Sequence, residues 1–135
     1  MEYLIKRIPS NEDLQKLYLS VGWDVYVKNN EDMTVLLKNT CYFVTVWDND
    51  QLVGLTRVIS DDHSIAYVQD ILIDPDYQGN GMGSNLLNMI KERFNHVRQV
   101  VLMTDTSEKT INFYEKNELL SLDKYDCTAF MKINQ

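Results

Sequence analysis

Three alternate glycines between an apolar strand and an amphipathic helix constrain this chain more than any other feature. Gly79, Gly81 and Gly83 follow the apolar residues 71–73, and helical spacing of apolar residues begins after them. Glycine adopts positive φ and lets a ligand approach the backbone closely. The start of a helix presents unpaired N–H groups and a partial positive charge. The segment therefore predicts a site for an anion such as a phosphate, rather than a simple turn into the helix.

The glycine spacing narrows the class of phosphate ligand. A nucleoside-triphosphate loop requires Lys before Ser or Thr, and Gly83-Ser84 has none. A dinucleotide fold requires G-x-G-x-x-G and an acidic residue about 20 positions further on. The spacing here is G-x-G-x-G, Asp105 is only a loose match for the acid, and strands and helices do not alternate from the first residues. A nicotinamide-dinucleotide-binding oxidoreductase is therefore a remote alternative.

Periodicity along the rest of the chain predicts an α+β fold. Strands are expected at residues 2–8, 41–47, 51–59, 65–73, 99–104 and 127–133. Helices are expected after Ser10, over 29–39, after Pro75 and over 107–117. Short turns join three of the strands into an antiparallel meander, and the later crossover requires a parallel pair. We predict a mixed, mostly antiparallel central sheet of about six to seven strands with helices on both faces.

Length and charge limit the function classes. The chain has 135 residues and a formal net charge of −7, which predicts one domain over residues 1–135. Nucleic-acid binding relies on clustered Lys and Arg, so we expect no nucleic-acid partner, whereas a cationic small molecule would be attracted. No apolar run approaches the roughly 20 residues of a membrane helix, and no secretory signal is visible. We therefore expect no membrane partner and a cytoplasmic location.

The two cysteines predict no metal or disulfide chemistry. Cys41 and Cys127 lie far apart in apolar, strand-like runs and match no metal-ligand spacing. Buried free cysteine behaves as a small apolar residue. We expect both to be reduced core residues.

Residues 78–83 carry a family resemblance. They resemble the Q/R-x-x-G-x-G/A signature of the GNAT superfamily of N-acetyltransferases. Residues 71–77 resemble its lead-in, an apolar strand followed by Pro-acidic-aromatic, and residues 111–116 resemble its later helix with an aromatic pair. The resemblance covers essentially the whole chain. It implies the acyl-CoA N-acyltransferase (GNAT) architecture, acetyl-coenzyme A as co-substrate without a metal, and a possible homodimer.

The resemblance also implies roles for particular residues. Backbone N–H groups of the glycine loop would bind the pyrophosphate of acetyl-coenzyme A, and the preceding strand would pair with its pantetheine arm and place an N–H near the thioester oxygen. Tyr114 would lie near the sulfur. The implied cofactor-binding residues are Ile71, Leu72, Ile73, Gln78, Gly79, Asn80, Gly81, Met82, Gly83 and Ser84.

Acetyl transfer to an amine requires few catalytic groups. The thioester is already activated, which agrees with a chain that lacks a Ser–His–Asp or Cys–His signature. Tyr114 is our candidate proton donor to the leaving thiolate, although an aromatic residue beside Phe113 is usually core. Asp70 is the candidate base, and it could also be a substrate anchor or one side of an exposed strand. Asp105 and a water relay are the rivals for the base.

The acceptor site is expected in the N-terminal half. Trp23 and Tyr26, with Asp24, form either an aromatic, mildly acidic wall for a cationic amine or a lid packed on the core. In the family, the helix with the aromatic pair is usually followed by Gly-Phe. This chain has Asn117 and the residues after it at that place instead. We predict an N-acetyltransferase that acts on a primary amine of an unidentified small cationic acceptor. The alternative is a non-catalytic acyl-CoA-binding sensor.

Overall fold

The computed structural model describes residues 1–134, which form two compact units, Met1–Met103 and a second that begins at Thr104. A single domain over residues 1–135 stays a prediction. The strands are β1 (Glu2–Ile5), β2 (Tyr42–Asp48), β3 (Gln51–Ser60), β4 (Ile65–Ile73) and β5 (Gln99–Leu102). The helices are α1 (Asn11–Ser20), α2 (Asp24–Asn29), α3 (Thr34–Lys38), α4 (Met82–Arg93) and α5 (Glu108–Lys116), with short 3-10 turns η1 (Pro75–Tyr77) and η2 (Leu122–Tyr125).

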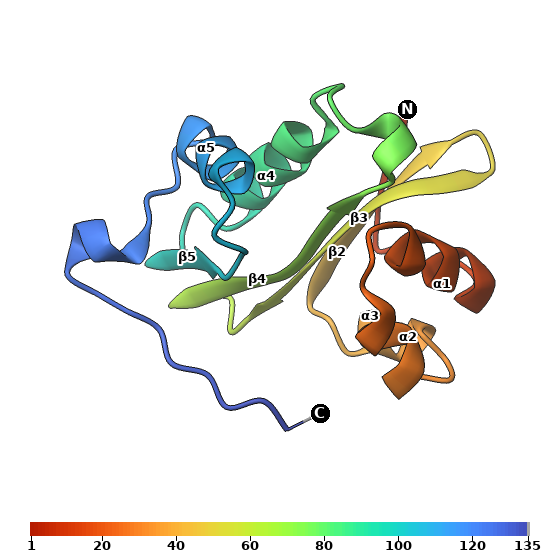
Figure 1. Cartoon of the computed structure of the whole chain (residues 1–135), viewed down its shortest axis with the longest axis horizontal. Coiled ribbons are helices and arrows are strands. Elements are labelled where there is room, and N and C mark those ends of the chain that lie inside the picture. Colours follow the sequence, from red (N-terminus) through yellow and green to blue (C-terminus); the bar gives the residue numbers. More distant parts are fainter. Residues whose placement is uncertain (135) are drawn as a thin grey trace. The chain divides into compact units, whose positions relative to one another are not determined.

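The first unit is built around one mixed sheet in the order β1-β2-β3-β4-β5. The pairs from β1 to β4 are antiparallel, and β4 pairs with β5 in parallel across the α4 crossover. Helices α1, α2 and α3 lie on one side of this sheet and α4 lies on the other (Figure 1). The predicted meander, parallel crossover and helices on both faces are confirmed.

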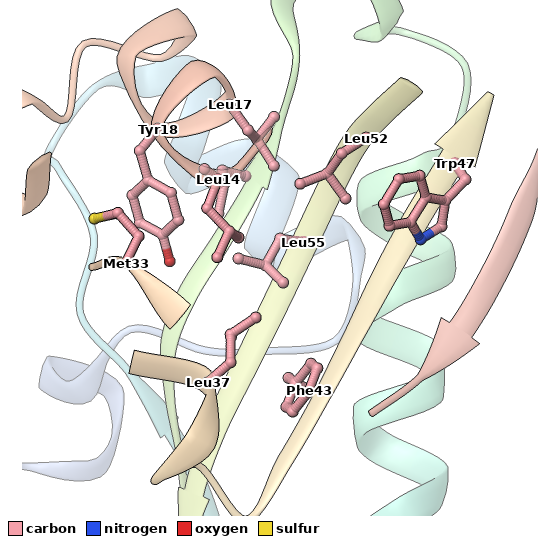
Figure 2. Close-up of a cluster of buried hydrophobic side chains, with 10 residues drawn as sticks. Leu14, Leu17, Tyr18, Met33, Leu37, Phe43, Trp47, Leu52 and Leu55 are labelled. Carbon is pink, nitrogen blue, oxygen red and sulfur yellow. The ribbon is translucent and has the colours of Figure 1, made fainter. Parts of the chain in front are cut away.

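The hydrophobic core begins with β2 and β3, which are covered on both faces. Residues 42–47 and 52–58 are all buried. On the side of α1, leucines and aromatic rings from the helices and strands form one cluster (Figure 2). Burying one such side chain stabilises the fold by about 1.5–3 kcal/mol. The cluster contains Leu14, Leu17, Tyr18, Met33, Leu37, Phe43, Trp47, Leu52, Leu55 and Leu72.

Helix α1 begins as its sequence predicts. The Ser10 side chain accepts a hydrogen bond from the Asp13 backbone N–H at 3.1 Å. This bond satisfies one of the free N–H groups at the helix start. Acidic residues in the first turn interact favourably with the positive end of the helix dipole. Leu14, Leu17 and Tyr18 face the core, so α1 anchors the N-terminal helical segment to the sheet.

The single helix expected over residues 29–39 is wrong. The structure has α2 up to Asn29 and a separate α3 from Thr34. The Asp32 carboxylate accepts from the Thr34 backbone N–H at 3.0 Å, and the Met33 N–H donates to the Asn11 side chain at 2.7 Å. These side-chain acceptors replace the carbonyls of a continuous helix, so the chain breaks between the two helices.

The second unit corrects the predicted number of strands. Helix α5 begins after Ser107, whose hydroxyl accepts from the Thr110 N–H, as the sequence predicts. Residues 127–133 form no strand, and the part of the chain that is described therefore has five strands rather than six to seven. Apolar periodicity favours an extended backbone, but a strand forms only where a neighbouring strand pairs with it. Phe130 is 93% exposed in this segment.

Both cysteines are free thiols, but the prediction that they are core residues is wrong. Cys41 and Cys127 are exposed. The Cys41 thiol donates to the Val58 carbonyl at 3.0 Å, so it lies beside the sheet without being covered by it. Cys127 follows η2 in the unpaired C-terminal segment.

Candidate functional site

The glycine loop connects the end of β4 to the start of α4. Gly79 and Gly81 have φ values of 86° and 80°, in the left-handed region that favours glycine. A Cβ built on either residue would meet no atom within 4 Å, so the backbone conformation alone requires glycine here. Gly81 is the N-cap of α4 and supplies no side-chain acceptor to the helix.

The amide N–H groups of residues 79–84 donate to no protein acceptor within residues 1–134. They belong to the loop and to the first turn of α4, a helix of 12 residues. Unpaired amides at a helix start combine with the helix dipole to favour a bound anion. Of the predicted donors in residues 78–83, the Gln78 N–H instead donates to the Pro75 carbonyl at 3.4 Å, whereas those of residues 79–83 are free within the described residues.

Hydrogen bonds in the residues just before the glycine loop fix its position. The Tyr77 hydroxyl donates to Asp48 at 2.6 Å, and the Gln78 side-chain amide donates to the Ile73 carbonyl at 3.0 Å. The Asp74 N–H donates to the Val53 carbonyl at 2.8 Å, which continues the β3–β4 pairing up to the loop. These bonds use groups other than the amides of residues 79–84. The loop is therefore fixed without consuming its own donors.

Strand β4 has an unpaired outer edge next to this loop. Its register with β5 ends at Val68↔Leu102, whereas its register with β3 continues to Gly54↔Ile73. Within residues 1–134 no strand pairs with the outer edge from Gln69 to Ile73. A bare strand edge offers N–H and C=O groups to an extended ligand, as in β-strand addition.

A β-bulge lies where β4 leaves β5. The register with β3 shifts from Val58↔Val68 to Arg57↔Asp70, so Gln69 is the extra residue. A bulge locally bends a strand and increases its twist. The bulge also places Asp70 directly opposite Arg57, on the face of the sheet that carries α1.

Asp70 is the centre of a buried polar cluster. Its Oδ2 accepts from the Tyr18 hydroxyl at 2.7 Å and forms an ion pair with Arg57 Nε, and its Oδ1 accepts from the Tyr26 hydroxyl at 2.8 Å. Gln69 donates to the Tyr26 oxygen at 2.9 Å. We call Tyr18, Tyr26, Arg57, Gln69 and Asp70 the Asp70 cluster. The reading of Asp70 as one side of an exposed strand is wrong, because its side chain is 0% exposed.

The electrostatics keep both tyrosines of the cluster neutral. Burial raises the pKa of Tyr18 well above its usual value, and the Asp70 charge raises it further. The same two causes, in the same order, raise the pKa of Tyr26. Burial alone would lower the pKa of Arg57, but the Asp70 carboxylate raises it overall, so the guanidinium stays charged.

Trp23 and Tyr26 form an aromatic group with Tyr18. Ring centroids lie 6.0 Å apart for Trp23 and Tyr26, and 5.1 Å apart for Tyr18 and Tyr26. Trp23 precedes α2, Tyr26 lies within it, and both rings are partly buried against the core. This packing agrees with a lid, and the partial exposure of the two rings agrees with a wall. Sequence reasoning missed Tyr18 and Arg57, because their part in the cluster depends on the β3–β4 register.

Tyr114 and Asp105 lie in the second unit. Burial raises the pKa of Tyr114 to about 12, with a smaller contribution from the Asp105 charge. Tyr114 is therefore protonated at neutral pH and can donate a proton. Hydrogen bonds from Ser107 lower the pKa of Asp105, with a further bond from Thr110, which makes Asp105 a weaker base than an ordinary aspartate.

Metal-binding and membrane-spanning features are absent from the part of the chain that the structure describes. Within residues 1–134, His, Cys, Asp and Glu side chains form no group of three or more that could hold a metal ion. In the same residues, no helix has the length and apolar character needed to cross a membrane. The sheet order, with a single parallel pair, also differs from the parallel sheet of a dinucleotide-binding fold.

The antiparallel meander and the parallel crossover define a mixed α+β fold, and the amides at the turn before α4 are free within the described residues. Residues 8–118 match the family described as Acetyltransferase (GNAT) family. The chain therefore belongs to the GNAT acetyltransferase family, and the family prediction is confirmed.

Related sequences and structures agree with this assignment. The chain is 32% identical over 111 residues to an uncharacterised N-acetyltransferase, ycf52, of Gracilaria tenuistipitata var. liui, covering 76% of this chain and 58% of that protein. It is 30% identical over 128 residues to a ycf52-like N-acetyltransferase of Prochlorococcus marinus, covering 90% and 69%. The chain spans 55–61% of the length of several curated relatives.

Solved structures share the fold over the whole chain. The GNAT-family protein SP0256 from Streptococcus pneumoniae TIGR4 superimposes with a TM-score of 0.86 at 34% identity, covering 99% of this chain and 98% of that one. SA2161 of meticillin-resistant Staphylococcus aureus, a protein of unknown function, gives a TM-score of 0.74 at 24% identity, covering 98% and 100%.

Proposed function

We propose that this protein is an N-acetyltransferase that transfers acetyl from acetyl-coenzyme A directly to a primary amine of a small cationic acceptor. The observation that carries the proposal is the row of free amides at residues 79–84 beside the unpaired edge of β4. A diphosphate fits the amides, and an extended amide-bearing arm fits the strand edge. Family membership supports acetyl transfer in general, and this geometry supports the thioester carrier in particular.

The chemistry requires a nitrogen–carbon bond to form and the carbon–sulfur bond of the thioester to break. An N–H on the outer edge of residues 71–73 would stabilise the negative charge that develops on the carbonyl oxygen. We propose that the Tyr114 hydroxyl supplies a proton to the leaving thiolate. Its pKa of about 12 keeps that proton available at neutral pH.

The proton on the acceptor amine must leave before attack. Direct acceptance by Asp70 stays a prediction, and the structure adds a requirement to it. The carboxylate is enclosed, Oδ2 holds two donors and Oδ1 holds the Tyr26 hydroxyl. An amine could reach Oδ1 only if Tyr26 moved aside. A water relay to bulk solvent remains the alternative, and Asp105 is the weaker rival because its pKa is lowered.

Coenzyme A binding tests the proposal with a matched pair of variants. Gly81 and Gly22 both have positive φ, 80° and 79°, and open space around a built Cβ. Gly81→Ala and Gly22→Ala should therefore cost similar folding free energy, about 1–2 kcal/mol. Only Gly81→Ala distorts the free amides, so it should weaken coenzyme A binding about tenfold or more by calorimetry. Equal affinities of the two variants would contradict the assignment.

Tyr114→Phe separates an enzyme from an acyl-CoA-binding sensor. The substitution removes only the hydroxyl, so coenzyme A affinity should stay constant. An enzyme that uses this proton should lose about 10²-fold or more in the rate of thiol release. A sensor would release no thiol with any amine, in the wild type as in the variant. A homodimer and a cytoplasmic location stay predictions, and light scattering would measure the first.

A further inference from the structure

Arg57 uses only one edge of its guanidinium within the Asp70 cluster. A guanidinium carries five N–H donors, one on Nε and four on the two Nη nitrogens. Nε donates to Asp70, and no acceptor within residues 1–134 takes a hydrogen bond from either Nη. The four Nη donors are therefore not used by a hydrogen bond within these residues.

The open Nη edge keeps some access to solvent. The Arg57 side chain is only 9% exposed. Within the described residues, no buried side-chain nitrogen or oxygen lacks a partner. Both Nη nitrogens therefore keep access to solvent, since they have no protein partner. A largely buried cation thus keeps hydrogen-bond donors that a ligand can reach.

The surroundings of the open edge restrict the ligand. The Arg57 Cζ lies 5.8 Å from the centre of the Tyr26 ring, which in turn contacts Trp23. The charged and titratable groups that affect Arg57 are Asp70, Tyr18 and Tyr26, and both tyrosines are neutral. The cluster thus has one cation and one anion. Its open donors lie beside partly exposed aromatic surface, where hydrogen bonds are less weakened by water.

We propose that the Nη edge of Arg57 binds a carboxylate of the acetyl acceptor, so that the acceptor is an amino-acid-like molecule with both an amine and a carboxylate. The planar fork of an arginine matches the two oxygens of a carboxylate. This inference rests on the proposed acetyl transfer to an amine. It specifies an acceptor whose cationic amine is accompanied by a carboxylate, so that its net charge is zero and it is not repelled by a protein of charge −7.

The position of Arg57 agrees with this role. It lies opposite Asp70, one register step from the point where β4 leaves β5. The outer edge of β4 that we assign to the thioester carrier begins at the same point. A carboxylate held by Arg57 would therefore keep the acceptor close to the strand along which the acetyl group is presented.

The test compares amines that differ only in the carboxylate. Glycine, β-alanine and 4-aminobutanoate are each paired with the corresponding primary amide, and thiol release from acetyl-coenzyme A is measured. For the carboxylate that fits, the wild type should show a kcat/KM about tenfold or more above that of its amide. Arg57→Lys keeps the charge but removes the fork. It should abolish this ratio through a higher KM, with coenzyme A affinity unchanged.

Two further variants keep the result interpretable. Arg98→Lys makes the same exchange at an exposed arginine and should leave the ratio as in the wild type. If Arg57→Lys does not fold, the double variant Arg57→Gln with Asp70→Asn replaces the ion pair by a neutral amide pair. Asp70 is also the candidate base, so for this double variant the comparison is made by calorimetry, and carboxylates and amides should then bind equally.

The outcomes separate this inference from the proposed function. Acetylation of the amides as fast as the carboxylates would overturn the inference and leave the acetyltransferase intact. If coenzyme A neither binds nor reacts, the proposed function fails, and calorimetric titration of the same amine pairs decides the inference by itself. It stands if carboxylates bind in an Arg57-dependent way, and it falls if carboxylates and amides bind equally or not at all.

Discussion

Asp70→Asn is the most direct measure of how the Asp70 cluster contributes to the fold. The carboxylate is 0% exposed and the Arg57 side chain 9%, so the substitution leaves a positive charge without its partner in a buried place. Asn can keep one oxygen toward Tyr18 and Arg57. Its NH2 group, however, would face the Tyr26 hydroxyl, which donates to the carboxylate in the wild type, so two donors would meet. Removing one partner of a buried pair costs about 3–5 kcal/mol, and the retained oxygen places this variant near about 3 kcal/mol.

Thermal unfolding followed by circular dichroism measures this loss. For a chain of 135 residues, about 3 kcal/mol corresponds to a decrease in Tm of about 10 °C. Asp62→Asn is the matched control, since it removes a carboxylate from an exposed pair with Arg93, where the side chains are 53% and 40% exposed. Solvent screens that pair, so the control should leave Tm nearly unchanged.

The single variant Arg57→Gln and the double variant Arg57→Gln with Asp70→Asn complete a mutant cycle. The double variant removes both charges, so it should be more stable than Asp70→Asn alone. If Asp70→Asn melts at the wild-type temperature, or if the two substitutions are simply additive, the charges are not coupled as the structure shows. The account of Arg57 as a partly satisfied cation would then fail as well.

Two further predictions concern other parts of the molecule. Gly54→Ala should lower the free energy of unfolding by about 1–3 kcal/mol in urea denaturation, because its Cβ would lie 2.9 Å from Ile73 Cδ1 and 3.2 Å from Val46 Cβ; unchanged stability would contradict this packing. Tyr114 has a raised pKa of about 12, so its proton is present below that pH and lost only above it. The ratio of wild-type to Tyr114→Phe rates should therefore stay constant from about pH 6 to pH 10, and a decline near pH 8 would refute the assigned protonation state.

The elements that local pattern determines were predictable from the sequence. The strand, glycine loop and helix follow from positions of residues that are close together in the chain. Ser10 and Ser107 cap helices where short-range spacing predicts them. The family signature depends on the same local order, which is why the family and the conformation of the glycine loop could be inferred before the fold was known.

The parts that depend on long-range pairing were not predictable. In a regular ladder continued from Val58↔Val68, Arg57 would oppose Gln69, and Asp70 would face the other side of the sheet. Only the bulge brings Asp70 to Arg57, and no pattern in the sequence marks a bulge. The strand prediction for residues 127–133 is wrong for the opposite reason. Their local pattern is that of a strand, but no neighbouring strand pairs with them.

Deletion of Gln69 would test whether the bulge itself creates the candidate site. Without this residue a regular ladder runs from Val58↔Val68 straight to Arg57↔Asp70, so the ion pair and the core-facing alternation both persist. The variant should therefore fold, losing only the bond from Gln69 to Tyr26.

The deletion should nevertheless impair ligand binding. The bulge lies at the residue after the last pair of β4 with β5, and a bulge bends its strand, so we expect it to keep the outer edge of β4 away from β5. A straight β4 could continue its pairing with β5 and close the edge that we assign to the pantetheine arm. We expect a cooperative melting transition but coenzyme A affinity weakened about tenfold or more by calorimetry. A folded deletion variant with wild-type affinity would show that the bare edge does not bind the carrier, and would leave the amides of residues 79–84 as the whole site.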